Sequence, residues 1–246
     1  MKRHVFAIIV FLSAAGNLSA QENWGGGVDD ELIHFGFTFQ YVNSEFKVLK
    51  KSGWRSPFYS EVEGGYVTDS LYSISSLGTP GFGLGFVTNV RLGDNADLRL
   101  TPNLVFSDRI VNFEYVSVTG AQTLVEKKVQ STLIDFPLGI KLKSDRRKNF
   151  RAYVLAGGKY SLDIVSKKKL DDEELIITEK LLKTRKGFLS YEAGVGFDLY
   201  FEYFKLSPEI KFSQSLNDVM KRENHPYSSP IDKLFLRNIQ LSLFFE

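Results

Sequence analysis

The 246-residue chain contains no cysteine, and this absence excludes disulfide bonds and thiolate metal sites. Beyond the first twenty residues no stretch approaches 18 apolar residues, so nothing there predicts a membrane-spanning helix. An excess of one charge is also missing. Without Lys2 and Arg3, 29 basic residues (31 − 2) balance 29 acidic ones. A balanced chain has no overall electrostatic attraction to nucleic acid, and we expect no nucleic-acid partner.

The first twenty residues have the organisation of a secretory signal peptide. Lys2 and Arg3 form a charged start, Val5 to Leu12 is an apolar run of eight residues, and small residues lead to a cleavage position after Ala20. The run is too short for a spanning helix, and a buried N-terminal helix is the alternative. We predict a signal peptide over residues 1–20 and one mature domain over residues 21–246.

Aromatic residues are abundant, with 21 Phe and 11 Tyr, and many of them recur at every second position. A period of two is the signature of a strand with one apolar face. The period occurs in eight segments, which are 32–41, 81–92, 97–106, 131–143, 151–164, 188–201, 203–213 and 237–246. The sequence therefore predicts eight strands.

The connections between these strands alternate in length. Short links are GDNA (93–96), SDRRKN (144–149) and a minimal turn near Glu202, while longer links cover about 44–80, 119–128, 166–186 and 217–234. All short turns then lie at one end and all longer loops at the other. Outer-membrane barrels have this asymmetry, with short periplasmic turns and longer external loops.

One strand contains a change of pattern. Its apolar positions pass from even numbers to the odd-numbered Val111, Phe113 and Tyr115 around Ser107–Arg109. A β-bulge produces such a switch, because it adds one residue to one strand of a pair. We therefore predict a bulge at this point.

Alternation alone does not tell which face points inward, because a lipocalin-like soluble barrel with an apolar interior has the same period. Three features favour the membrane: the loop asymmetry, the missing cysteines and the aromatic residues at strand ends. Tyr200, Phe201, Tyr203 and Phe204 flank one short turn, as in the aromatic girdle of outer-membrane barrels. We predict an all-β fold, an eight-stranded antiparallel transmembrane β-barrel (OmpX-like) in the outer membrane of a Gram-negative cell.

The last predicted strand runs to Glu246 with an apolar outer face. In an open sheet such a strand is an aggregation-prone edge, whereas closure of a barrel pairs it with the first strand. We expect that pairing, with Phe245 facing lipid.

Seven basic and five acidic residues fall on the polar, inward side of the predicted strands. They are Arg91, Arg99, Lys141, Arg151, Lys159, Lys205 and Lys211 with Asp135, Asp163, Glu192, Asp198 and Glu209. Eight strands enclose a lumen that side chains can just fill, so mixed charges at this density favour an ion-pair network that closes it. A binding or conducting role for these charges is the alternative.

Catalytic signals are weak, and we expect no enzyme, no cofactor, no metal site and no small-molecule substrate. The only histidines beyond residue 20 are His34 in the first strand and His225 in the last loop, and neither has a local catalytic spacing. The glycines of VLAGGKYS (154–161) lack the spacing of a phosphate loop. Relief of crowding in a narrow barrel is the simpler explanation for them.

Three stretches of the chain together resemble PorT-type outer-membrane proteins of the type IX secretion and gliding-motility systems of Bacteroidota. They are STLIDFPLGIKLKSDRRKNFRAYVLAGGKYSLDI (131–164), YEAGVGFDLYFEYFKLSPEIKFSQSLNDVM (191–220) and LFLRNIQLSLFFE (234–246). The family supplies no catalytic residues to carry over. The resemblance implies a small integral barrel that is needed to export proteins with C-terminal sorting domains.

Two functional hypotheses of different class follow. One is a non-enzymatic outer-membrane barrel of type IX secretion, an assembly or accessory component whose partners are the lipid bilayer and other secretion-system proteins. The other is a stand-alone surface barrel, either an adhesin or an envelope stabiliser. A lipid-modifying enzyme is a third and weaker possibility.

Overall fold

The computed structural model describes residues 31–164 and 175–246, so the predicted signal peptide lies outside the described residues. Every element in the described part is a strand. Within these residues no helix has the length and apolar character needed to cross a membrane. The strands are β1 (Ile33–Lys50), β2 (Tyr59–Ser60), β3 (Gly65–Tyr66), β4 (Ser70–Leu77), β5 (Thr79–Gly93), β6 (Ala96–Leu100), β7 (Asn103–Phe106), β8 (Arg109–Val116), β9 (Gln122–Val129), β10 (Thr132–Lys143), β11 (Phe150–Asp163), β12 (Gly187–Tyr200), β13 (Lys205–Ser215) and β14 (Ile231–Phe245).

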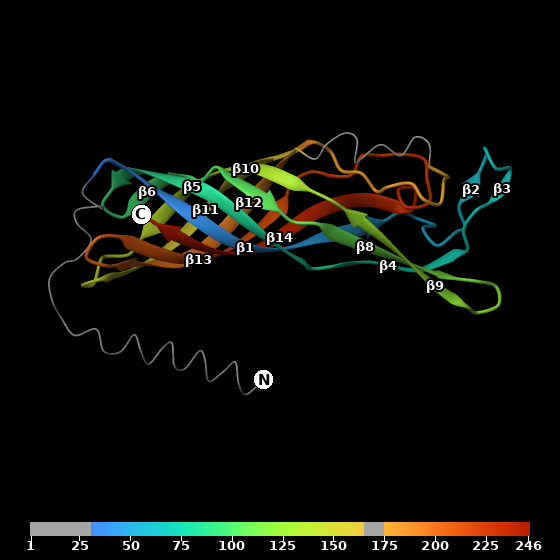
Figure 1. Cartoon of the computed structure of the whole chain (residues 1–246), viewed down its shortest axis with the longest axis horizontal. Helices are drawn as coiled ribbons and strands as arrows, with labels where there is room; N and C mark the ends of the chain where they lie inside the picture. Colours follow the sequence, from blue (N-terminus) through green and yellow to red (C-terminus); the bar gives the residue numbers. More distant parts are fainter. Residues whose placement is uncertain (1–30, 165–174) are drawn as a thin grey trace, which may run out of the picture.

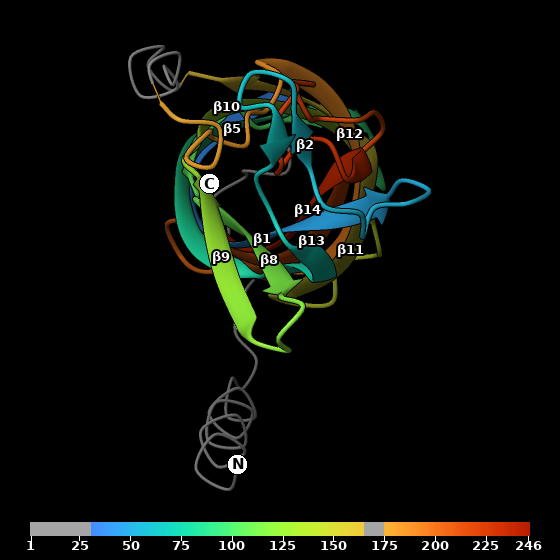
Figure 2. The same cartoon turned by 90° about the vertical axis from the view of Figure 1, so that its right-hand side faces the viewer.

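The main sheet closes into a barrel. Its order is β1-β14-β13-β12-β11-β10-β6-β5, and β7 continues β6 at the same position between β5 and β10. Closure is made by β1, on which Phe37 lies opposite Phe245 of β14 on one side and Phe86 of β5 on the other. Figure 2 shows the resulting ring end-on. The predicted eight-stranded antiparallel barrel and the pairing of its last and first strands are confirmed.

Three strands continue beyond the ring at one end. β4, β8 and β9 form a separate antiparallel sheet, and each follows or precedes a barrel strand along the chain. Figure 1 shows this sheet and the β2–β3 hairpin at the end opposite the short turns. By the rule for outer-membrane barrels, the end with the β4–β8–β9 sheet faces outside the cell. We call this sheet the external sheet.

The predicted bulge at Ser107–Arg109 is wrong. β6, β7 and β8 follow one another as a single line of strand that faces β10 and β9. One register holds along this line, from Ala96 opposite Leu142 to Arg109 opposite Val129. The one-residue offset lies on the neighbouring strand, where Phe82 is opposite Phe106 but Leu77 is opposite Ile110. Odd-numbered side chains of this line face inward throughout, and it is the polarity of the interior that changes.

The predicted loops are shorter than the sequence pattern suggested. β1 continues to Lys50 and β4 starts at Ser70, so the link predicted at 44–80 is mostly strand. β9 occupies most of the predicted 119–128 link, and β14 begins at Ile231. At these places the strands continue beyond the lipid-facing belt. Their inward side chains are apolar there and their outward side chains are polar, which is the reverse of a membrane strand. The sequence pattern of a membrane strand therefore stops before the strand itself ends.

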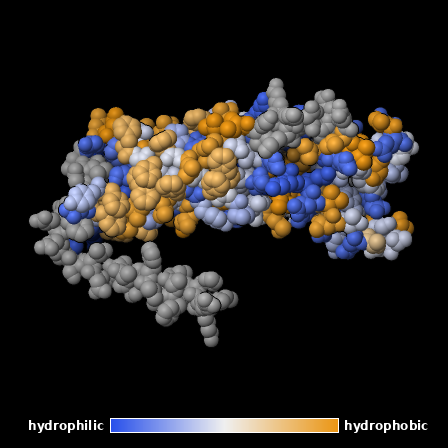
Figure 3. All heavy atoms as spheres, in the orientation of Figure 1, coloured by the Kyte–Doolittle hydropathy of each residue, from blue (hydrophilic) through white to orange (hydrophobic). Residues whose placement is uncertain are grey.

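The outer wall of the ring is apolar. Exposed Phe, Leu, Ile, Val and Tyr side chains cover it, among them Phe37, Phe39, Phe82, Phe86, Phe136, Ile140, Val154, Leu189, Ile210 and Leu241. Figure 3 shows apolar side chains concentrated over the half with the short turns and hydrophilic ones more frequent at the other end. Apolar exposure on this scale has a physical explanation only in contact with lipid.

The predicted aromatic girdle at the 200–205 turn is confirmed only in part. Tyr203 and Phe204 are exposed, and Phe201 stacks on Phe204 with ring centroids 4.8 Å apart. Tyr200 is buried instead, with the guanidinium of Arg146 placed 3.8 Å from its ring centroid. Tyr200 is even-numbered and faces inward with Asp198, so alternation could have separated it from the girdle.

Gly157 shows why glycines occur in β11. A Cβ on this residue would lie 2.5 Å from the Cα of Gly139 on β10, which is closer than packing allows. The two strands therefore approach closely because both lack a side chain here, as the crowding explanation predicted. Gly158 has no such neighbour.

Candidate functional site

The half of the lumen nearer the short turns is filled with charged side chains. Buried basic residues are Arg99, Lys141, Lys143, Lys159, Lys205 and Lys211, and buried acidic side chains are Asp97, Asp135, Glu192, Asp198, Glu209 and Glu246. Strand alternation places them here, because each follows or precedes a lipid-facing apolar residue by one position. Within this set six basic side chains balance six acidic ones, and one further buried cation, Arg109, lies beyond it toward the external end. We call this set the charged layer.

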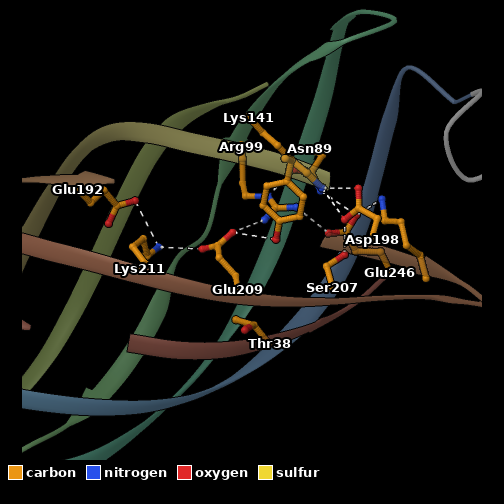
Figure 4. A network of polar contacts seen from close by, with 12 residues as sticks. Thr38, Asn89, Arg99, Lys141, Glu192, Asp198, Ser207, Glu209, Lys211 and Glu246 are labelled. Carbon is orange, nitrogen blue, oxygen red and sulfur yellow. Dashed lines mark hydrogen bonds and ion pairs between the residues drawn. The ribbon is translucent and has the colours of Figure 1, made fainter. Parts of the chain in front are cut away.

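Arg99 of β6 lies at the centre of the charged layer (Figure 4). Its Nη1 is 3.0 Å from Oε2 of Glu209, and its Nη2 is 3.1 Å from Oε1 of Glu246. Its Nε donates to Oδ1 of Asn89 at 2.8 Å. The ring of Phe244 lies 4.6 Å from the guanidinium carbon. Arginine suits this position because its planar fork donates in several fixed directions.

Glu246 is a second centre of contacts, and its side chain is fully buried. One of its oxygens lies 2.6 Å from Nζ of Lys205 and 3.2 Å from Nε2 of His34, and it also accepts from Nδ2 of Asn89 at 2.9 Å. The other oxygen faces Arg99. This carboxylate therefore joins side chains of β1, β5, β6 and β13.

The remaining charges form smaller groups along the lumen. Nζ of Lys141 lies 2.8 Å from Asp198, which also accepts from the hydroxyl of Ser207 at 2.6 Å. The separations in the other pairs are 2.6 Å for Lys143–Asp97, 2.9 Å for Lys159–Asp135 and 3.3 Å for Lys211–Glu192. The prediction that the inward charges form an ion-pair network is confirmed.

The sequence-predicted inward residues do not all belong to the charged layer. Arg91 is at the rim, 32% exposed and 2.6 Å from Asp94, and Arg151 and Asp163 are only half-buried. Alternation could not show this, because it gives the face of a strand but not the depth along the barrel axis. The prediction also missed Asp97, Lys143 and Glu246, although Asp97 and Lys143 continue the inward parity of their strands.

Above the charged layer the interior is mainly apolar, with one buried cation, Arg109 of β8, whose guanidinium lies 5.8 Å from the ring centroid of Phe46. The inward side chains of β1 change from the polar Thr38 and Gln40 to the apolar Val42 and Phe46. Along β7 and β8 the inward side chains change in the same way, from Asn103 to Phe113. The buried residues of this apolar core are Val42, Phe46, Leu71, Ile74, Val105, Val111, Phe113, Tyr115, Val129, Leu133, Leu182, Phe188, Val219, Met220, Tyr227, Ile231, Leu234 and Leu236. The external end of the barrel is therefore built like the interior of a soluble domain.

Two loops close the external end by adding side chains to this apolar core. Leu182 comes from the segment before β12, and Met220 and Tyr227 come from the segment before β14. Backbone bonds join the two loops, since Arg185 N donates to Val219 O at 2.7 Å. The ring of Tyr227 packs edge-on against Phe113 with centroids 5.2 Å apart.

This arrangement favours closure of the lumen over chemistry inside it. An apolar core and a charged layer lie one behind the other along the axis, so an ion would have to displace both. Among residues 31–164 and 175–246, no group of His, Asp and Glu side chains could hold a metal ion. His34 contacts Glu246 and Lys205, and Nδ1 of His225 accepts from the backbone N of Tyr227 at 3.3 Å.

The chain matches the family model of the outer membrane protein beta-barrel domain over residues 20–221. No curated protein matches it. It is similar to the solved structure of Neisserial surface protein A, at 7% identity over 87% of this chain and 98% of that one, with a TM-score of 0.40. It is also similar to Ail of Yersinia pestis, solved in complex with the heparin analogue sucrose octasulfate, at 11% identity over 86% and 96% with a TM-score of 0.36. For OprG of Pseudomonas aeruginosa the identity is 12% over 85% and 94%, with a TM-score of 0.34.

The family match spans most of the chain, and the described residues supply the features that such a domain requires. These are a closed ring of eight antiparallel strands, an apolar outer wall and short turns at one end only. The chain therefore belongs to the family of outer-membrane β-barrel proteins, and the protein resides in the outer membrane.

Proposed function

We propose that this protein is a non-enzymatic outer-membrane barrel required for type IX protein secretion, where it acts as an assembly or accessory component of the translocon. The observation that supports this best is the filled lumen. Buried charges such as Arg99 and Glu246 occupy its inner half, and buried apolar residues such as Phe113 occupy its outer half. A barrel of this kind offers no route for a folded cargo, so it acts through its surfaces.

The assignment to type IX secretion comes from the resemblance of residues 131–164, 191–220 and 234–246 to PorT-type proteins. These residues build β10 to β14 and the turns between them. The resemblance includes the lipid-facing wall and buried lumen residues. Among the latter, Lys159 pairs with Asp135, and Glu192 pairs with Lys211.

The use made of the two histidines supports a non-enzymatic role. His34 is 6% exposed and held between Glu246 and Lys205, where it serves the charged layer. His225 is 3% exposed, its ring Nδ1 accepts a hydrogen bond from the backbone N of Tyr227 at 3.3 Å, and it lies in the segment before β14. Both rings are used in packing and hydrogen bonding that a buried polar residue requires.

Partner proteins would contact the surfaces outside the lipid belt. The outer face of the external sheet has exposed or half-exposed side chains of mixed character, including Tyr72, Glu114, Leu124 and Lys128. At the other end the basic turn 144–149 is mostly exposed to the periplasm. Interfaces of assembled complexes commonly combine such aromatic and charged groups.

Deletion of the gene tests the proposal. Cargo proteins with C-terminal sorting domains should accumulate in the periplasm, and other outer-membrane proteins should still assemble. Immunoblots of periplasm and culture medium measure the first effect, and heat-modifiable migration of an unrelated barrel measures the second. Plasmid-borne wild-type protein should restore secretion. Normal secretion in the deletion strain would refute the assignment to this pathway.

A stand-alone surface barrel is the second candidate, and the external sheet favours it. β4, β8 and β9 extend the barrel beyond its lipid-facing wall and so present a structured surface to the medium. For an adhesin or an envelope stabiliser, deletion should leave cargo secretion unchanged and reduce surface attachment or resistance to detergent. The same deletion strain therefore separates the two candidates.

A further inference from the structure

A cleft of about 430 Å³ lies at the external end of the barrel, above the apolar core. Three segments meet there: the loop after β1, the start of β4 with Tyr115 of β8, and the loop before β14. Its walls include the aromatic rings of Trp54, Phe58, Tyr59 and Tyr115. A volume of this size is within the range of small-ligand sites.

The walls of the cleft are fixed by hydrogen bonds rather than free to collapse. Lys51 N donates to Pro230 O at 3.0 Å, which ties the first loop to the last one. Leu71 N donates to Arg55 O at 3.0 Å, and Phe58 N donates to Oγ1 of Thr68 at 2.9 Å. A ligand that enters such a cleft does not have to order the loops, and this lowers the cost of binding.

The lining combines aromatic rings with hydroxyl groups. The hydroxyl-bearing residues are Ser52, Ser56, Tyr59, Thr68, Tyr115 and Ser229. Asn224 adds an amide, and the charged groups are one ammonium, of Lys51, and one carboxylate, of Glu61. Two further cations lie beside the lining, Lys50 at 4.1 Å and Arg55 at 4.9 Å from the ring centroid of Trp54, and many lining groups both donate and accept hydrogen bonds.

Tyr115 adds to the lining of the cleft a polar atom without a partner in the part of the chain that the structure describes. Its side chain is 6% exposed, and its hydroxyl has no hydrogen-bond partner among the described residues. Burial raises the pKa of this phenol, so it keeps its proton and remains a donor. A buried donor without a partner costs free energy, and a ligand would recover it only if a neighbouring side chain moved, because the hydroxyl oxygen is itself buried.

We propose that this external cleft binds a saccharide unit of a cell-surface glycan. A sugar ring offers C–H faces that pack on aromatic rings and hydroxyls that pair with the hydroxyl-rich lining. An aliphatic peptide side chain would fill the same volume but leave those hydroxyls and Asn224 unpaired, which is unfavourable.

Trp54 provides a direct reporter for this proposal. The chain has two tryptophans: Trp54 lines the cleft, and Trp24 lies outside the described residues. In a Trp24→Phe background, the emission of the purified, detergent-solubilised protein is titrated with maltotriose, cellotriose and deacylated lipopolysaccharide from the source strain. We expect a saturable change with at least one of them. The first two probes represent external glucans, and the third represents the glycan of the cell itself.

Tyr59→Ala tests the stacking contact, and Tyr72→Ala is its matched control. Both tyrosines are more than half exposed, but Tyr72 lies on β4 outside the cleft. We expect Tyr59→Ala to weaken saccharide binding about tenfold and Tyr72→Ala to leave it unchanged. Heat-modifiable migration on a gel checks that both variants fold.

Two outcomes overturn the proposal. One is the absence of a saturable response to all three saccharides, and the other is equal weakening by Tyr59→Ala and Tyr72→Ala. Saturation by a proline-rich decapeptide without any saccharide response would assign the cleft to a peptide instead. The proposal depends on the cleft and its outward position and is independent of the secretion role, so either can fail alone.

Discussion

Arg99 donates to Glu209 on β13 and to Glu246 after β14, so one side chain of β6 connects distant strands across the lumen. Both carboxylates are fully buried. Transfer of a charge from water into such a site is costly, and the arrangement is stable only because every charge has partners at hydrogen-bond distance. Removal of one partner leaves the others buried without compensation.

We predict that Arg99→Met destabilises the barrel by about 3–5 kcal/mol, because two buried carboxylates lose a cation. Arg91→Met is the matched control. Arg91 is at the rim, where its partner Asp94 is 85% exposed, and the expected cost is about 1 kcal/mol or less. Urea titration in lipid vesicles, followed by the fraction of folded protein on a gel, measures both. Equal losses for the two variants would contradict the special role of Arg99.

The residue scale also shows how far the sequence could predict the charged layer. Alternation along β11 and β12 correctly placed Lys159 and Glu192 inward, because parity alone decides the face. The choice of partner could not follow, since Lys159 pairs with Asp135 on β10 through a register that only strand pairing reveals. The central role of Glu246 in the charged layer was missed, because alternation does not show which side chains lie opposite a residue across the lumen.

At the scale of elements, the strand pattern was predictable wherever one face meets lipid. Such strands keep an apolar outer face, and the predicted and observed segments agree for β10 to β13. The pattern failed for β8 and β9, which leave the lipid belt. There the inward face is apolar, as Val111 and Phe113 show, and the outward face bears Glu114 and Lys128. A sequence with exchanged polarity was therefore interpreted as a bulge and a loop.

The orientation of these elements can be tested with single cysteines, because the natural chain has none. We predict that a cysteine at Ser75 on β4 labels on intact cells with a membrane-impermeant maleimide, because this residue is exposed at the external end. A cysteine at Asp145, exposed in a short turn, should label only after the outer membrane is permeabilised. Ser228 is 2% exposed, so a cysteine there should resist labelling in both conditions. The reverse pattern for Ser75 and Asp145 would invert the barrel.

At the scale of the whole molecule, the charged layer and the apolar core follow one another along the barrel axis. The charged layer resists an ion because each of its charges has an opposite charge beside it, and the apolar core above it offers an ion few polar groups. Some strands contribute to both, and β1 carries Gln40 in the polar part and Phe46 in the apolar part. The barrel therefore combines the construction of a membrane protein at one end with that of a soluble β-domain at the other.

We predict that the wild-type barrel shows no steady conductance in planar lipid bilayers, with a 16-stranded porin as positive control. Phe113→Ala should lower stability by about 3–5 kcal/mol through the cavity that it leaves, but the charged layer beneath should keep the lumen closed. Only a variant that combines Phe113→Ala with Arg99→Ala and Glu209→Ala removes material from both layers, and this variant should show intermittent currents. Porin-like conductance of the wild type would refute a filled lumen, and steady conductance of Phe113→Ala alone would show that the apolar core is the sole barrier.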